Sequence, residues 1–189
     1  MKFKTNIIDV TGENISKYPQ AICFINPKNE FFNRKVSWLK KQFQNGLKIK
    51  LLYIDEVKRP VGFIEYIPGE YCWRSVSAKK YLFIHCLWTN GKKFQHHGLG
   101  KLLISEVEND VKNELGIAVV TSDNSFMTNK EIFLKCGYDI ISESGKEQLL
   151  VKQLKKGPLP FINDWRKELE KYTGLAIVYS RQCPWVARF

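Results

Sequence analysis

Apolar residues recur along the chain at two spacings, and each spacing predicts a different kind of element. Short runs of strand-forming residues predict strands at residues 3–10, 47–55, 61–67, 81–89, 117–121, 139–141 and 148–154. Apolar residues three or four apart predict a helix over residues 29–45 and another that begins at Leu99, and a short helix is expected over residues 129–135. Residues 71–76 either extend the strand before them or begin a loop. This order predicts a mixed α/β (α+β) chain in which strands come first.

The two long helices each have one apolar face and a predicted end. Gly46 follows the first helix, where glycine is common because it adopts a left-handed conformation without strain. Gly116 is predicted to stop the second helix. The apolar faces consist of Phe32, Val36, Leu39 and Phe43 in the first helix, and of Leu99, Leu103, Val107 and Val111 in the second.

The chain of 189 residues is long enough for one domain with its own core and a short tail. A glycine and two prolines between Lys155 and Pro160 cannot continue a strand, so a boundary is expected there. We therefore expect a domain over residues 1–157 and a separate C-terminal segment over residues 158–189. Within that segment, residues 164–172 predict a short helix that Gly174 caps, and residues 176–180 are strand-like.

The net charge of +11 raises the question of a nucleic-acid partner. Most of the excess lies in the first third of the chain, dispersed, without a block of five like charges. Such a distribution is typical of a solvated surface, and the functional alternative is long-range attraction of a polyanionic small molecule. Nucleic-acid binding is a third, less favoured interpretation, and a homodimer is one option for the oligomeric state.

The cysteines and the lengths of the apolar runs indicate the compartment of the protein and the redox state of its thiols. Five cysteines, an odd number without a C-x-x-C pair, favour reduced thiols and no metal site. No run of 18 apolar residues occurs, and the first residues lack the long apolar segment of a signal peptide. We therefore expect a cytoplasmic protein with no membrane partner.

The most informative motif lies between the apolar strand at residues 81–89 and the helix that begins at Leu99. It has the pattern Gln-x-x-Gly-x-Gly, in which Gly98 and Gly100 let the main chain come close to a ligand. A turn that opens a helix presents unpaired N–H groups and a favourable dipole to an anion. The motif therefore indicates a nucleotide-type cofactor bound through phosphate. Its residues are Gln95, His96, His97, Gly98, Leu99 and Gly100.

Motif and element order together resemble the GNAT N-acetyltransferase superfamily over residues 2–156. The resemblance implies the GNAT fold, with a central mixed, mostly antiparallel sheet flanked by helices. It also implies acetyl-CoA as the cosubstrate, no metal, and a pyrophosphate bound by the backbone from Gln95 to Lys101. The main chain of Leu87, Trp88 and Thr89 is expected to pair with the pantetheine arm, and one of its N–H groups to polarise the acetyl carbonyl. For Leu87 and Trp88, packing in a core strand is the alternative, and both can hold. Further cofactor contacts are assigned to Asn129 and Phe133.

One residue departs from the pattern of the family. Phe133 stands four residues before Gly137, where many members have a tyrosine that protonates the leaving thiolate. A thiol with a pKa of about 8.5 leaves without much help. Deprotonating an amine with a pKa of about 10.4 at pH 7 costs about 4.6 kcal/mol, so a base matters more than an acid.

The candidates for this base are Glu65, His85 and Glu70. A histidine buried in the core is the alternative interpretation of His85. Tyr71, Cys72, Trp73 and Tyr138 are considered for the acceptor pocket, and ordinary packing is the favoured interpretation of all four.

A finer resemblance, to acetyltransferases with a C-terminal YoaP-like, thioredoxin-like domain, extends into the tail. It rests on Cys86-Leu87-Trp88, on the stretches 126–127 and 132–138, and on residues 174–185 with their Cys-Pro pair. The resemblance implies that residues 158–189 are a linker and the start of a truncated YoaP-like segment. Cys183 is then either a thiol with a lowered pKa at a helix start or an unreactive one.

These observations predict an N-acetyltransferase that moves acetyl from acetyl-CoA to a primary amine by direct attack in a ternary complex. The acceptor, a small molecule or a peptide, stays unknown. The alternative is a catalytically impaired module that binds acetyl-CoA, which the phenylalanine at position 133 motivates.

Overall fold

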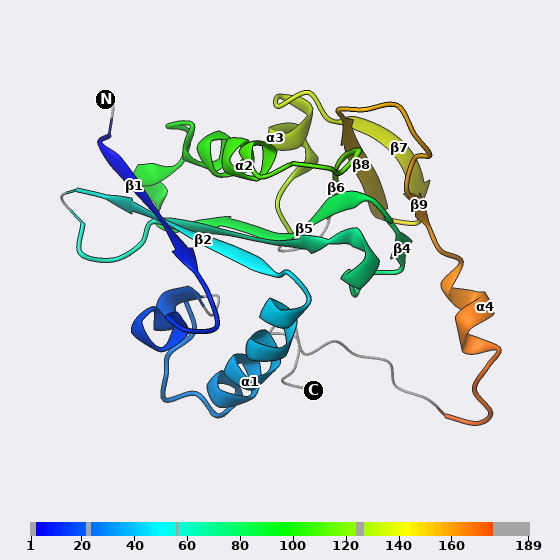
Figure 1. Cartoon of the computed structure of the whole chain (residues 1–189), viewed down its shortest axis with the longest axis horizontal. Helices are drawn as coiled ribbons and strands as arrows, with labels where there is room; N and C mark the ends of the chain where they lie inside the picture. The colour runs from blue at the N-terminus through cyan, green and yellow to red at the C-terminus, as the bar shows by residue number, and fades with distance from the viewer. Residues whose placement is uncertain (1–2, 22–23, 56, 124–126, 176–189) are drawn as a thin grey trace.

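A mixed, seven-stranded sheet forms the centre of the protein (Figure 1). The computed structural model describes residues 3–21, 24–55, 57–123 and 127–175. The strand order is β1-β2-β3-β5-β6-β8-β7, and every neighbouring pair is antiparallel except β5 and β6. The strands are β1 (Thr5–Val10), β2 (Lys48–Ile54), β3 (Gly62–Pro68), β5 (Tyr81–Thr89), β6 (Gly116–Ser122), β7 (Asp139–Ser144) and β8 (Glu147–Gln153). The predicted mixed, mostly antiparallel sheet is confirmed.

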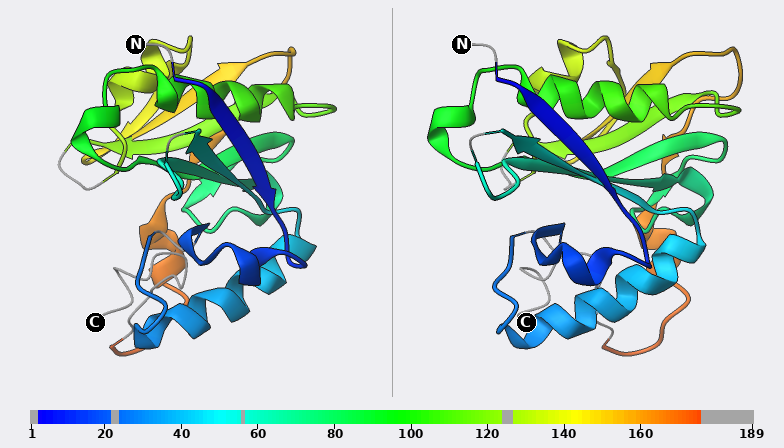
Figure 2. Two further views of the ribbon diagram at one scale, coloured as in Figure 1. Left: turned by 90° about the vertical axis from the view of Figure 1, so that its left-hand side faces the viewer. Right: turned by 60° about the vertical axis from the view of Figure 1, so that its left-hand side comes forward.

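Helices cover both faces of this sheet and enclose two separate cores. Helix α1 (Glu30–Gln44) and the short 3₁₀ turns η1 (Ile15–Lys17) and η2 (Pro19–Ala21) lie on one face (Figure 2). Helices α2 (Leu99–Asn109) and α3 (Lys130–Leu134) lie on the other. Because strand side chains alternate between the faces, the sheet contributes apolar residues to both cores.

The predicted helix ends are confirmed for α1 and corrected for α2. The side chain of Asn29 accepts a hydrogen bond from the N–H of Phe31 (2.9 Å) and caps the start of α1. Gly46, with a φ of 84°, follows the end of α1 as predicted. Helix α2 ends at Asn109, so Val111 lies beyond it.

Gly116 was predicted to stop α2, and this prediction is wrong. Gly116 is the first residue of β6, and its Cβ, if it had one, would lie 2.2 Å from the carbonyl oxygen of Lys152 on β8. The glycine therefore permits the close approach of two strands. A sequence pattern cannot distinguish this from a helix stop, because both favour the residue without a Cβ.

The segment that was ambiguous between strand and loop is a loop. It follows the 3₁₀ turn η3 (Gly69–Tyr71) and leads into the short strand β4 (Val76–Ser77). Strand β4 pairs with β9 (Phe161–Ile162), which lies beyond the predicted boundary at residue 157. The start of the C-terminal segment therefore packs on the main sheet region.

The rest of the C-terminal segment is helical only over a short stretch. Helix α4 (Trp165–Leu169) is shorter than predicted, and Gly174 is too far from its end to cap it. The strand-like run at residues 176–180 and Cys183 lie outside the described residues. No described helix is both long and apolar enough to cross a membrane.

Candidate active site

Strands β5 and β6 are paired over only part of their length. Parallel pairing runs from Tyr81 with Gly116 to Ile84 with Val119, and from His85 onward β5 is paired with β3 alone among the described residues. The pairing with β3 skips a residue at the same point, because Glu65 is opposite Cys86 whereas Tyr66 is opposite Ile84. His85 is therefore the extra residue of a β-bulge, a feature that bends a strand and re-aims its side chains.

The backbone of β5 beyond this bulge alternates between the two edges of the strand. The carbonyl of Leu87 accepts a hydrogen bond from the hydroxyl of Thr128 (2.6 Å), whereas the N–H of Asn90 donates to Val61 beside β3 (2.7 Å). Because the N–H and C=O of one strand residue point the same way, Leu87 and Thr89 direct their backbone groups away from β3. Trp88 directs its own toward β3, and its side chain is half exposed (48%).

The predicted phosphate turn leads directly into α2. The 3₁₀ turn η4 (Lys92–Phe94) precedes it, and the N-cap residue of α2 is Gly98 in the left-handed conformation (φ 78°). The first helical hydrogen bond runs from the N–H of Leu102 to the carbonyl of Gly98 (3.0 Å). The N–H groups of Leu99, Gly100 and Lys101 therefore have no partner within the helix and can bind an anion.

The two glycines of the motif have different physical roles. A Cβ at Gly98 would meet nothing within 4 Å, so this position opens onto space that a ligand can fill, and its positive φ favours glycine. A Cβ at Gly100 would lie 2.5 Å from Cδ1 of Ile132 on α3. Gly100 therefore also lets α2 pack closely against the Ile132 side chain of α3, a contact that the motif itself does not indicate.

Of the remaining residues predicted to bind the cofactor, three are exposed at the turn, one caps a helix and one is buried in the core. Gln95, His96 and His97 are exposed at the turn, and the ring of His97 meets that of Phe3 edge-on (5.2 Å). Asn129 caps α3 by accepting a hydrogen bond from the N–H of Glu131 (2.9 Å). The ring of Phe133 is completely buried and packs edge-on against Tyr138 (5.4 Å).

The same arrangement places Tyr138 away from the bulge. It belongs to the core beneath α2 and α3, and burial raises the pKa of its hydroxyl far above the ordinary value. Ordinary packing, the favoured interpretation of Tyr138, is therefore confirmed.

Two of the three candidate bases, Glu65 and His85, lie at the β-bulge, on the face of the sheet that α1 covers. The third, Glu70, is exposed in η3, where its Oε1 accepts a hydrogen bond from the N–H of Lys80 (3.0 Å). Glu65 on β3 is buried (1% exposed), and its Oε2 lies 3.5 Å from Nζ of Lys35 on α1, which is equally buried. The ammonium of Lys35 also lies 4.0 Å from the centre of the Trp38 ring. A carboxylate and an indole face therefore compensate a buried cation.

His85 stacks on an aromatic residue beside this ion pair. Its ring is parallel to that of Trp73, with centroids 3.5 Å apart, and Trp73 meets Trp38 edge-on (4.6 Å). Burial lowers the pKa of His85 well below its ordinary value, and the positive charges of Arg74 and Lys35 lower it further. His85 is therefore neutral at pH 7.

Three residues around this site were missed by sequence reasoning. Lys35 lies four residues before Leu39, on the buried side of α1, so helical spacing could have shown that it faces the sheet. Arg74 and Thr128 lie on connecting segments, and only the fold brings them to β5. Among the described residues, no group of three or more potential ligands could hold a metal ion.

Comparisons with known proteins agree with this geometry. The sequence model described as Acetyltransferase (GNAT) family matches residues 20–138. The chain is 25% identical over 186 residues to an uncharacterized N-acetyltransferase, YoaP, of Bacillus subtilis (strain 168), a match that covers 94% of this chain and 72% of the relative.

Solved structures share the fold at low sequence identity. An acetyltransferase from Thermus thermophilus superposes with a TM-score of 0.58 at 14% identity, over 80% of this chain and 97% of that one. The PaiA N-acetyltransferase from Thermoplasma acidophilum, solved in complex with coenzyme A, gives 0.55 at 13% identity over 79% and 99%. With the interrupted pairing of β5 and the phosphate turn at α2, the match over residues 20–138 leads to one conclusion: the chain belongs to the acetyltransferase (GNAT) family and is an enzyme of the N-acetyltransferase class.

Proposed function

We propose that this enzyme transfers acetyl from acetyl-CoA to a primary amine by direct attack in a ternary complex. The observation that carries the proposal is the free N-terminus of α2 beside the unpaired edge of β5. The N–H groups from Leu99 to Lys101 would bind the pyrophosphate. Charge-assisted hydrogen bonds contribute about 1.5–3 kcal/mol each, so a few of them dominate binding.

The backbone of β5 supplies the groups that would orient the thioester. Leu87 and Thr89 point their backbone groups away from β3, and the N–H of Leu87 is the donor that we assign to the acetyl carbonyl. A fixed donor of this kind stabilises the negative charge that develops on the carbonyl oxygen during attack. The new C–N bond forms as the C–S bond breaks, and CoA leaves as a thiolate that needs no tyrosine at position 133.

The attacking amine must reach the thioester without its extra proton. The burial and the two cations that lower the pKa of His85 would also lower the pKa of an ammonium group at the bulge. Glu65 and His85 are our candidates to accept the proton. If either does so, its replacement by glutamine should lower kcat/KM by about 100-fold or more and alter the pH–rate profile. A profile unchanged in both variants would exclude the pair.

Calorimetric titration of coenzyme A into two matched glycine variants tests the cofactor site. Gly98 and Gly145 both have a positive φ and open space where a Cβ would lie, but Gly145 is in the turn between β7 and β8. We expect Gly98→Val to weaken CoA binding at least tenfold, because its side chain fills the space next to the free N–H groups. Gly145→Val is subject to similar backbone strain and should bind CoA as the unaltered protein does. Equal affinities in all three would refute the assignment.

A module that binds acetyl-CoA without turnover is the second candidate, which the buried phenylalanine at position 133 favours. A set of amine acceptors with acetyl-CoA distinguishes the two. CoA release that depends on the acceptor supports the transferase, and binding without any turnover supports the module.

A further inference from the structure

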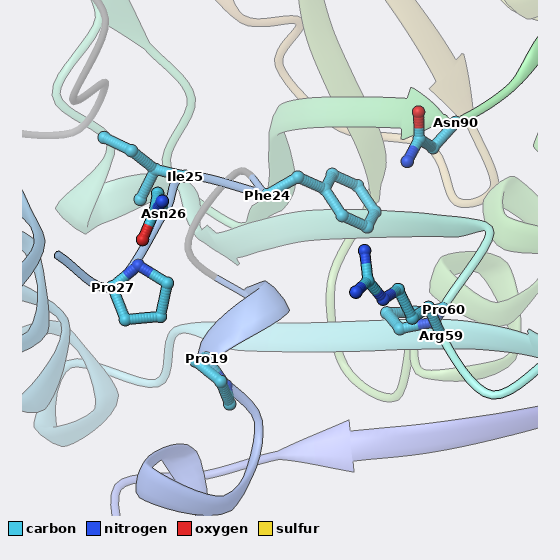
Figure 3. A pocket seen from close by; sticks show the side chains of 8 residues that line it. All are labelled: Pro19, Phe24, Ile25, Asn26, Pro27, Arg59, Pro60 and Asn90. Atoms are coloured by element: carbon cyan, nitrogen blue, oxygen red, sulfur yellow. The ribbon is translucent and has the colours of Figure 1, made fainter. Parts of the chain in front are cut away.

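A pocket of about 450 Å³ lies at the end of β5, five residues beyond the bulge at His85, and neither Glu65 nor His85 lines it. Asn90, which directly follows β5, lines one side, and Arg59 and Pro60 from the connection between β2 and β3 line another. Phe24 and its neighbours, before α1, form the opposite wall. Figure 3 shows the side chains of Arg59 and Asn90 directed into the pocket, close to the ring of Phe24.

The pocket lies on the same face of the sheet as the candidate proton acceptors. The ring of Phe24 packs edge-on against Phe63 (centroids 5.6 Å apart), and Phe63 belongs to the core beneath α1. Phe63 is two residues before Glu65 on β3, so both side chains point to one face. Asn90 follows His85 by five residues, which is roughly 16 Å of extended strand. An elongated acceptor can therefore extend from the bulge toward the pocket.

The charge of the pocket is positive and uncompensated. Arg59 forms no ion pair with any residue that the structure describes, and none of the residues lining the pocket is acidic. Apolar and polar side chains share the rest of the lining, with Phe24, Ile25 and three prolines beside Asn26 and Asn90, and Arg59 is exposed. A planar guanidinium with five donors matches a carboxylate or a phosphate.

We propose that this pocket binds an anionic group on the acceptor, so that the enzyme acetylates elongated amines that carry a carboxylate or a phosphate at the end remote from the nitrogen. The inference rests on the proposed transfer to an amine. The amine of such an acceptor meets Glu65 and His85 at the bulge, while Arg59 holds the opposite end. Two anchoring points also orient the nitrogen toward the thioester, which favours the reaction.

Probes of matched length test the proposal. The assay compares kcat/KM for 11-aminoundecanoate, 11-aminoundecanamide and 10-aminodecyl phosphate in the unaltered enzyme, in Arg59→Gln and in Lys58→Gln. Lys58 is an exposed neighbouring cation that does not line the pocket, so its variant controls for a general loss of positive charge. We expect at least a tenfold preference for one anionic probe over the amide. That preference should disappear in Arg59→Gln and persist in Lys58→Gln, and the favoured probe identifies the anion as carboxylate or phosphate.

Direct titration of each probe without acetyl-CoA separates the pocket from the transfer. If an anionic probe binds the unaltered protein but not Arg59→Gln, the result supports the pocket, whether or not an amine is acetylated. If no amine is acetylated, the proposed function is overturned instead. Equal acetylation of acid and amide by the unaltered enzyme overturns the pocket and leaves the transferase standing. A preference that survives in Arg59→Gln also overturns it.

Discussion

Lys35 and Glu65 form a completely buried ion pair between α1 and the sheet, at the point where the candidate chemistry takes place. Taking two charges out of water costs several kcal/mol per ion, and their attraction repays this only while both are present. His85 lies beside them and is kept neutral by the same surroundings. Replacing any of these three residues should therefore change both the free energy of unfolding and the charge at the candidate active site.

Removing either partner of the ion pair should destabilise the protein. We expect Lys35→Met and Glu65→Gln each to lower the free energy of unfolding by about 3–5 kcal/mol, because each leaves a buried polar or charged group uncompensated. The double variant should lose clearly less than the sum of the two. Urea unfolding of all four proteins measures this coupling, and strictly additive losses would show that the two side chains do not interact.

His85 should make the stability depend on pH in mildly acid solution. Its pKa is lower in the folded protein than in the unfolded chain, so the unfolded chain binds the additional proton as the pH falls below about 6.5. The stability that is present above this pH should decrease by up to about 1.4 kcal/mol per pH unit toward pH 5. Urea unfolding at intervals between pH 8 and pH 5 measures the slope. In His85→Phe the slope should be smaller, and an unchanged slope would assign the effect to other groups.

The elements position the site through two local features, the bulge in β5 and the helix start at Gly98. The bulge lets β5 leave β6 after Ile84, and α2 contacts β3, β5 and β6, so its N-terminus is held beside the freed edge. The strands around the site also approach one another closely at glycines, where a Cβ would collide with the neighbouring backbone. One such close approach to backbone is at Gly116, where β6 begins next to β8.

A methyl group at the start of β6 should disturb the sheet. Gly116→Ala would place Cβ 2.2 Å from a backbone oxygen, which cannot move aside as a side chain does. We expect a loss of about 1–3 kcal/mol or more in the free energy of unfolding. Gly12→Ala is the control, because its nearest neighbour would be a side-chain atom of Phe43 at an ordinary 3.7 Å. Thermal and urea unfolding of both variants check this, and equal stabilities would contradict the strand contact.

At the scale of the whole molecule, the sheet separates the face to which we assign the cofactor from the face to which we assign the acceptor. The phosphate turn belongs to the face covered by α2 and α3, whereas Glu65, His85 and the Arg59 pocket belong to the face covered by α1. At the interruption between β5 and β6, a ligand could extend from one face of the sheet to the other. A ligand bound there would contact strands from both halves of the sheet.

Coenzyme A should therefore stabilise the folded protein as a whole. At a concentration 100 times its Kd, a ligand that binds only the folded state adds about 2.7 kcal/mol. For a chain of this length that corresponds to a rise in Tm of roughly 5–10 °C. Differential scanning fluorimetry measures it, with adenosine, which lacks the pyrophosphate, as the comparison ligand. A comparable rise with adenosine would mean that the phosphate turn contributes little.

The sequence by itself determined the elements and the phosphate turn, because both depend on local properties. Hydrophobic spacing defines a helix or strand wherever it occurs, and the glycines at positions 98 and 100 mark a turn that opens a helix. The family was recognisable from the same motif and the order of elements. Even so, the role of Gly116 was predicted wrongly, and the packing of Gly100 against Ile132 was not predicted, since each depends on a neighbour that is distant in the sequence.

Only the tertiary structure decided which residues surround the chemistry. It paired Lys35 with Glu65, stacked His85 on Trp73, and brought Arg59 beside Asn90 at the end of β5. Such contacts join segments tens of residues apart, and their energies depend on burial and distance, which no local pattern specifies. The motif that marks the cofactor turn therefore gives no information about the acceptor. The charge that we propose for the acceptor was inferred from the position of Arg59 in the folded protein.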